Sequence, residues 1–156
     1  MMSRIEHYSG SVVLADDDKD HALLFRRVLQ GVAPEKHLTV VEDGESLLKL
    51  LSVYVPDLLF LDLDMPFRHG LECLQEIRST LHLRDMKVVV YTGSAEATDI
   101  RKSFIHKADL YVVKPFHSLH LVQALKTVLN FNWKDEAAPK YYYINNSFVP
   151  YTFQGL

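Results

Sequence analysis

Residues 57–62 read DLLFLD, a short apolar run that ends at the carboxylate of Asp62. Pro56 precedes this run and a loop rich in structure-breaking residues follows it, which is typical of a buried β-strand over residues 57–61. Four other runs have the same form and lie at residues 11–15, 38–41, 87–91 and 110–113. Because a longer amphipathic stretch follows each run, the sequence predicts five alternations of strand and helix.

The amphipathic stretches predict helices at residues 18–30, 45–53, 71–79, 95–106 and 118–130. We expect Gly31 to end the first helix and the hydroxyl of Ser118 to cap the last one. Near-continuous apolar strands indicate a parallel sheet with helices on both faces, and right-handed crossovers make it doubly wound. The predicted fold class is therefore α/β, with a five-stranded parallel sheet whose functional crevice lies beyond the carboxyl ends of the strands.

Polar side chains stand at those strand ends, in chain order Asp16, Asp17, Asp62, Asp64, Thr92 and Lys114. Taken singly, each has a duller interpretation as a solvated helix start, a loop acid, a turn residue or a surface lysine. Taken together, at least three carboxylates share a small volume and need a cation to relieve their repulsion. A hard ion with oxygen ligands, Mg²⁺, suits such a site and leaves positions free for phosphate oxygens. The set therefore indicates phosphoryl transfer, with a carboxylate as covalent acceptor.

Composition narrows the class of protein. A length of 156 residues fits one domain with a short appendage. With a net charge of −3 and no visible basic face, no nucleic-acid partner is expected. The single cysteine, Cys73, excludes a disulfide framework and is interpreted as a buried structural thiol. Residues 1–6 have no apolar core of a signal peptide and no run could span a membrane, so we expect a cytoplasmic protein with no membrane partner.

The segment at residues 131–156 is rich in aromatic residues. The chain has eight Phe, eight Tyr and one Trp, and eight of these residues fall in this segment. Disordered tails are usually poor in aromatics. We expect the tail to pack on the domain at residues 9–130, or else on a second copy or another partner, which leaves a homodimer open.

Five segments of the sequence resemble the receiver domains of two-component response regulators. They are residues 12–17 (VVLADD), 56–62 (PDLLFLD), Met65-Pro66 with Gly70, 89–93 (VVYTG) and 111–116 (YVVKPF). The resemblance covers roughly residues 9–130 and implies the flavodoxin-like (βα)₅ receiver fold. It also implies a single-domain phosphorelay protein that signals through contacts with other proteins and is not an enzyme in the usual sense.

The resemblance implies a role for each matching residue. Asp62 would accept the phosphoryl group, Asp17 would ligate Mg²⁺, Asp16 would assist at the metal, and Asp64 would offer its backbone carbonyl. Thr92 and Lys114 would contact the phosphoryl oxygens, Tyr111 would turn inward with Thr92 as a switch, and Pro115 would follow a cis bond. The donor would be a sensor histidine kinase or a histidine phosphotransfer protein, and the downstream protein is not identified.

Two other functions stay open at this point. The first is an aspartyl-phosphate phosphotransferase or phosphatase, in which Asp64 would be the second acid. The second is a scaffold with the receiver fold that is never phosphorylated. Asp64 also suggests the hypothesis that its carboxylate alters the lifetime of the phosphoryl group by repelling or ordering the attacking water.

Overall fold

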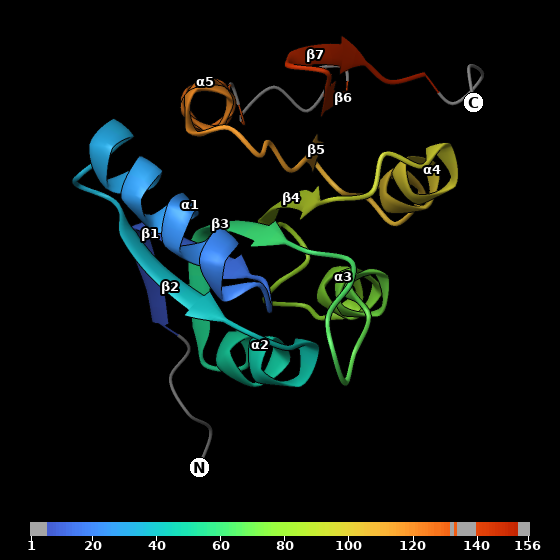
Figure 1. The fold of residues 1–156 in the computed structure, drawn as a ribbon. Helices are drawn as coiled ribbons and strands as arrows, with labels where there is room; N and C mark the ends of the chain where they lie inside the picture. Colours follow the sequence, from blue (N-terminus) through green and yellow to red (C-terminus); the bar gives the residue numbers. More distant parts are fainter. Residues whose placement is uncertain (1–5, 132, 134–139, 153–156) are drawn as a thin grey trace.

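The computed structural model describes residues 6–131, 133 and 140–152, and its centre is one seven-stranded sheet (Figure 1). The strands are β1 Glu6–Ala15, β2 His37–Val41, β3 Tyr54–Leu61, β4 Lys87–Thr92, β5 Leu110–Val113, β6 Tyr141–Ile144 and β7 Ser147–Pro150. They lie in the order β2-β1-β3-β4-β5-β6-β7, and only the pairing of β6 with β7 is antiparallel. The predicted five-stranded parallel sheet is therefore confirmed, with two further strands beside β5.

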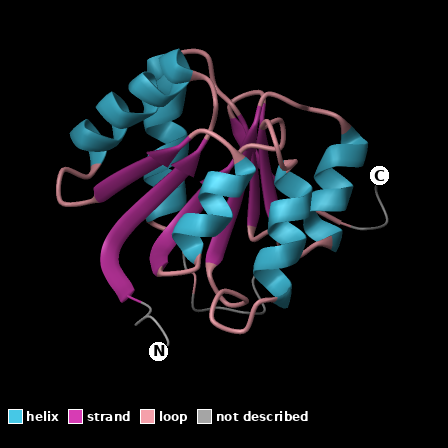
Figure 2. Ribbon diagram, turned by 90° about the horizontal axis from the view of Figure 1, so that it is seen from below, coloured by secondary structure: helices cyan, strands magenta, loops and turns pink. Residues whose placement is uncertain are grey.

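Five helices cover both faces of the sheet. They are α1 Lys19–Val32, α2 Gly44–Leu51, α3 Gly70–Ser79, α4 Ala97–Ile105 and α5 Ser118–Leu129. Helices α1 and α5 pack together on one face, and α2, α3 and α4 follow one another on the other (Figures 1 and 2). This is the three-layer arrangement that the alternation of strands and helices predicts. None of the helices in the described ranges has the length and hydropathy of a membrane span.

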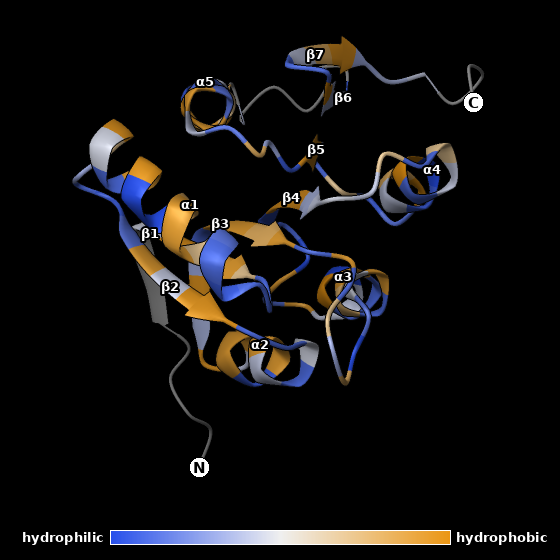
Figure 3. Ribbon diagram, viewed as in Figure 1, coloured by the Kyte–Doolittle hydropathy of each residue, from blue (hydrophilic) through white to orange (hydrophobic). Residues whose placement is uncertain are grey.

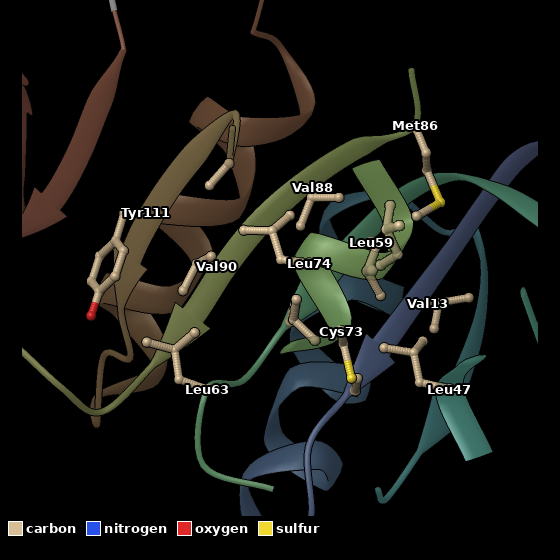
Figure 4. Close-up of a cluster of buried hydrophobic side chains, with 14 of the residues drawn as sticks. Val13, Leu47, Leu59, Leu63, Cys73, Leu74, Met86, Val88, Val90 and Tyr111 are labelled. Carbon is tan, nitrogen blue, oxygen red and sulfur yellow. The ribbon is translucent and has the colours of Figure 1, made fainter. Parts of the chain in front are cut away.

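Each face of the sheet carries its own hydrophobic core, because successive strand residues point to opposite faces. Val13, Leu59 and Val90 pack toward α2, α3 and α4, whereas Leu14 and Phe60 pack toward α1 and α5. The apolar colour of the central strands contrasts with the mixed colouring of the helices (Figure 3). Figure 4 shows the first core, in which Cys73 lies among aliphatic side chains. Cys73 is thus a buried thiol, and burial raises its pKa to about 11.

The predictions that Gly31 ends the first helix and that Ser118 caps the last one are wrong. Helix α1 continues through Gly31 to Val32, and the backbone N–H of the buried Ala33 still donates to Leu29 O at 2.8 Å. Burial at the end of this helix outweighs the roughly 1 kcal/mol that a helical glycine costs. At α5 the cap is His117 and not Ser118, because the His117 ring Nδ1 accepts a hydrogen bond from Leu119 N at 3.2 Å.

The aromatic-rich tail forms a hairpin on the domain itself. Strand β6 pairs with β5 over Leu110–Val112, and β7 turns back on β6 through Asn145 and Asn146, whose φ angles are 50° and 64°. The ring of Tyr151 stacks on Phe104 of α4, with a centroid separation of 4.5 Å. The hairpin thus covers the edge of β5. Residues 1–5 and Phe153, on which other expectations depended, lie outside the described residues.

Candidate phosphoacceptor and metal site

The loop after β1 places two carboxylates at the carboxyl edge of the sheet. Asp18 caps α1 by accepting a hydrogen bond from His21 N at 3.0 Å, which fixes where the helix begins. Asp16 is 1% exposed and its Oδ1 accepts a hydrogen bond from Asp18 N at 3.0 Å, whereas Asp17 is exposed. The local chain therefore provides one buried acid and one solvent-facing acid side by side.

Asp62 follows β3 directly and is 4% exposed. Its backbone N–H donates to Ala15 O at 3.0 Å, which holds the end of β3 beside the end of β1. Its Oδ1 accepts a hydrogen bond from Asp64 N at 3.2 Å. A Cβ on Gly70 would lie 2.2 Å from Asp62 O, so glycine allows α3 to begin directly against this strand end.

The two strand ends bring three carboxylates together. Asp16, Asp17 and Asp62 each offer an oxygen that lies within 4.8 Å of the other two. Three oxygen donors this close, one of them facing solvent, fit a hard divalent cation that keeps some of its waters. The prediction that these three residues converge is therefore confirmed, and they form an acidic group able to hold a metal ion.

Asp64 does not join this group through its side chain. Its carboxylate is 84% exposed, and Oδ1 lies 3.9 Å from Nε2 of His69. A second acid for leaving-group protonation would have to face the phosphoacceptor. The phosphatase interpretation therefore has no support from the position of Asp64.

Lys114 faces the acids from the end of β5. Its Nζ lies 2.7 Å from Asp16 Oδ2 and 2.8 Å from Asp62 Oδ2. Its backbone N–H donates to Thr92 O at 2.8 Å, so β4 and β5 fix its position. No cis peptide bond occurs in the described residues, so the expected cis bond before Pro115 is wrong for this structure. An X–Pro bond prefers trans by about 0.5–1 kcal/mol, and here the ammonium reaches both acids with the trans bond.

The charges in this cluster depend on one another. Burial raises the pKa of Asp16, against the opposing interactions with Lys114 and the Asp18 N–H. Burial disfavours the Lys114 ammonium too, but its interactions with Asp16 and Asp62 outweigh that cost and raise the pKa of Lys114. Lys114 is therefore a fixed cation at neutral pH, and Asp16 is an acid that gains from an added positive charge.

The two residues expected to form a switch lie on the neighbouring strands β4 and β5. Thr92 is fully buried, and among the described residues its Oγ1 has no hydrogen-bond partner. Tyr111 is also fully buried and its hydroxyl donates to Ser94 O at 2.8 Å, in the loop that follows Thr92. Figure 4 shows the Tyr111 ring beside Val90 and Leu63. Tyr111 therefore points inward in this structure.

Two residues near the site were not predicted from the sequence. Tyr91 lies under the Lys114 ammonium, and His21 of α1 lies against Tyr91. Tyr91 directly precedes Thr92 on a strand that is buried on both faces, so its side chain had to lie on the α1 side. That alternation is the signal that could have identified it.

Comparison with known proteins agrees with this geometry. Residues 12–126 match the model of the response regulator receiver domain family. Among curated proteins, the chain is 25% identical over 136 residues to the probable methanogenesis regulatory protein FilR2 of Methanothrix harundinacea (strain 6Ac), covering 82% of this chain and 88% of FilR2. It is 31% identical over 130 residues to the transcriptional regulatory protein CpxR of Klebsiella pneumoniae subsp. pneumoniae (strain HS11286), covering 81% of this chain. The chain spans only 53% of the length of CpxR.

Two solved structures of response regulators share the fold and at least a quarter of the aligned sequence. The phosphorylated cyanobacterial phytochrome response regulator RcpA superposes with a TM-score of 0.72 at 28% identity, covering 82% of this chain and 96% of RcpA. The Mn²⁺-bound form of response regulator Rcp1 superposes with a TM-score of 0.70 at 25% identity, covering 82% of this chain and 96% of Rcp1.

Proposed function

Because this chain belongs to the response regulator receiver domain family, we propose that it accepts a phosphoryl group on Asp62 and signals through protein contacts that depend on phosphorylation. One observation carries the proposal: the Lys114 ammonium lies between the carboxylates of Asp16 and Asp62, beside the exposed carboxylate of Asp17. This arrangement supports the proposal, because three carboxylates and a cation share one small volume.

The acceptor step needs positioning more than covalent catalysis by the protein. An oxygen of the Asp62 carboxylate attacks phosphorus of a phosphohistidine on the donor; the O–P bond forms as the P–N bond breaks, and the imidazole leaves with a proton from solvent. Lys114 contacts a phosphoryl oxygen and offsets the added charge. The hydroxyl of Thr92, which has no partner among the described residues, bonds a second phosphoryl oxygen.

Mg²⁺ is the proposed cofactor, held by Asp16, Asp17 and Asp62 with the backbone carbonyl of Asp64. When bound, the ion neutralises the negative charge that gathers on the transferring phosphoryl group. The phosphorylated RcpA supports a phosphoacceptor role for this site, and the Mn²⁺-bound Rcp1 supports a divalent metal. Burial raises the pKa of Asp16, and this supports the metal role as well, because a nearby divalent ion would stabilise a buried carboxylate.

The proposed partners are a sensor histidine kinase or a histidine phosphotransfer protein as donor, and a downstream protein that reads the surface near Thr92 and Tyr111. Tyr111 lies on β5, and its hydroxyl donates a hydrogen bond to Ser94 O in the loop before α4. This bond connects β5 to that loop. A change at Thr92 can therefore reach α4 through this loop.

The test is the intact mass of the protein after incubation with acetyl phosphate and Mg²⁺. We expect the parent to gain the mass of one phosphoryl group, and Asp62→Asn to gain none. Asp64→Asn is the matched control, because its exposed carboxylate lies outside the acidic group. It should be phosphorylated, and its rate of phosphate loss tests whether Asp64 affects the attacking water; a rate equal to the parent's would remove that hypothesis. An unmodified parent would favour the scaffold interpretation.

A further inference from the structure

Tyr91 lies in the core beneath Lys114 and has no exposed surface. Its ring is enclosed by aromatic neighbours from two elements: Phe25 of α1 at 5.4 Å and Phe60 of β3 at 5.8 Å between ring centroids, both edge-to-face. Such contacts stabilise one ring orientation. The Tyr91 ring therefore stands as a fixed plane on the α1 side of β4.

The hydroxyl of this ring is tied to α1. His21 Nε2 lies 2.5 Å from Tyr91 Oη, and the two rings are 5.3 Å apart. Burial, and then the Asp16 and Asp62 charges, raise the pKa of Tyr91, so its hydroxyl stays protonated. Burial and the Lys114 charge lower the pKa of His21. The neutral His21 ring and the protonated Tyr91 hydroxyl are thus joined by one hydrogen bond, whose direction depends on the tautomer of His21.

The Lys114 ammonium lies over the Tyr91 ring. Its Nζ lies 5.8 Å from the centroid of the Tyr91 ring, within the range of a cation–π contact. A lysine side chain is a flexible stem with a compact charge, so two carboxylates and an aromatic ring restrict it more than the carboxylates do alone. Phosphorylation converts the Asp62 carboxylate into an acyl phosphate and removes one of those carboxylates. The Asp16 carboxylate and the Tyr91 ring are the neighbours that do not change.

We propose that Tyr91, held in place by His21, is a positioning residue that keeps the Lys114 ammonium over Asp62 while Asp62 is being phosphorylated. The proposal rests on the proposed function, because it concerns the same transfer step. Neither residue touches the transferring group: Tyr91 acts through Lys114, and His21 acts through Tyr91.

The experiment measures the rate of phosphorylation of the full chain by acetyl phosphate with Mg²⁺, by intact mass over time. Tyr91→Leu removes the ring and should lower the rate by about tenfold, the effect of losing one partly desolvated cation–π contact. Tyr91→Phe keeps the ring and loses only the hydroxyl, so a decrease of about twofold is expected. His21→Leu should match Tyr91→Phe, and His21→Gln, whose amide can hydrogen-bond the Tyr91 hydroxyl as donor or as acceptor, should restore the parent rate.

Repeating Tyr91→Leu on a Lys114→Ala background separates positioning from packing. If Tyr91 acts through Lys114, its loss changes nothing further once the ammonium is gone. The same tenfold decrease on both backgrounds would make Tyr91 a packing residue only and overturn the proposal. If Tyr91→Leu does not fold, the two His21 variants provide the test. Equal rates of phosphorylation for His21→Leu and His21→Gln would reject a role for the His21–Tyr91 hydrogen bond. If the parent takes no phosphoryl group, the proposed function itself is wrong. If the parent is phosphorylated but reacts no faster than its Tyr91 and His21 variants, only the positioning role is wrong.

Discussion

The acidic rim and the C-terminal hairpin lie on the same sheet but are held there in different ways. The rim residues Asp16, Asp62 and Lys114 each follow a parallel strand, and strand pairing brings those ends together. The hairpin pairs with β5 through β6 alone, and the ring of Tyr151 adds a stacking contact with Phe104. The rim is therefore positioned by the pairing of the central strands, whereas the hairpin depends on one strand pairing at the edge together with side-chain packing. Changes to the backbone should affect the first region, and loss of side chains should affect the second.

The largest effect is expected from Gly70→Ala. The new Cβ would lie 2.2 Å from Asp62 O and 2.7 Å from the Leu63 Cα, both backbone atoms that cannot rotate away. We expect a loss of about 3 kcal/mol or more in the free energy of unfolding, because backbone must shift to relieve the clash. Phosphorylation should fall as well, since Asp62 itself moves. Urea denaturation and the intact-mass assay measure the two quantities.

Gly31→Ala is the matched control, because a Cβ there meets no atom within 4 Å and the residue lies inside α1. It should stabilise the protein by about 0.5–1 kcal/mol and leave phosphorylation unchanged. If both glycine variants behaved alike, the close approach of α3 to the end of β3 would not matter to the site.

The rim was predictable from the sequence, and the hairpin was not, for the same physical reason. A buried parallel strand is recognised from its apolar run, and once five such runs are ordered, Asp16, Asp62 and Lys114 must meet. Strand β6 has no local signal for its partner: Tyr141–Tyr143 could pair with any open edge. The tail was expected to pack on the domain itself or on a partner, but pairing with β5 depends on contacts distant in sequence. The trans bond before Pro115 likewise depends on a small energy difference that no motif determines.

In the hairpin, the largest effect is expected from Tyr151→Ala. Its side chain is 7% exposed, stacked on Phe104 and edge-on to Tyr142. Its removal should cost about 3 kcal/mol in the free energy of unfolding, the lower end of the range for a buried aromatic. The rate of phosphorylation by acetyl phosphate should stay within about twofold of the parent, because Tyr151 does not contact the acids. Leu81→Ala, whose side chain is 76% exposed, is the control and should cost less than about 0.5 kcal/mol.

A larger decrease in rate for Tyr151→Ala would show that the two regions are coupled. The residue that could couple them is Tyr111, which pairs in register with Tyr142 of β6 and is packed in the same core as Tyr151. In that case the hairpin would help to hold Tyr111 in its inward position.

The rim should also respond to pH in a way that the hairpin does not. Because burial raises the pKa of Asp16 above 3.8, the folded state binds its proton more tightly than the unfolded chain does. Stability without divalent metal should therefore fall as pH rises from about the unfolded value through the raised folded value. Asp16→Asn should remove that decrease and weaken Mg²⁺ binding. Denaturation curves at several pH values in EDTA measure this; an unchanged slope in Asp16→Asn would assign the pH dependence to another group.

The smallest effect is expected at the turn of the hairpin. Asn145 and Asn146 both have positive φ, the conformation that a two-residue β-turn of type I′ requires. Asn146→Gly should therefore stabilise the protein by about 0.5 kcal/mol, because glycine adopts a φ of 64° without strain. Asn146→Ala should destabilise it by about 1 kcal/mol, since alanine tolerates that region poorly. Opposite signs for these two variants, with equal rates of phosphorylation, would mean that the turn contributes to docking of the hairpin and that the rim is independent of it. Equal stabilities would mean instead that the turn contributes little and that the pairing of β6 with β5 and the aromatic contacts hold the hairpin.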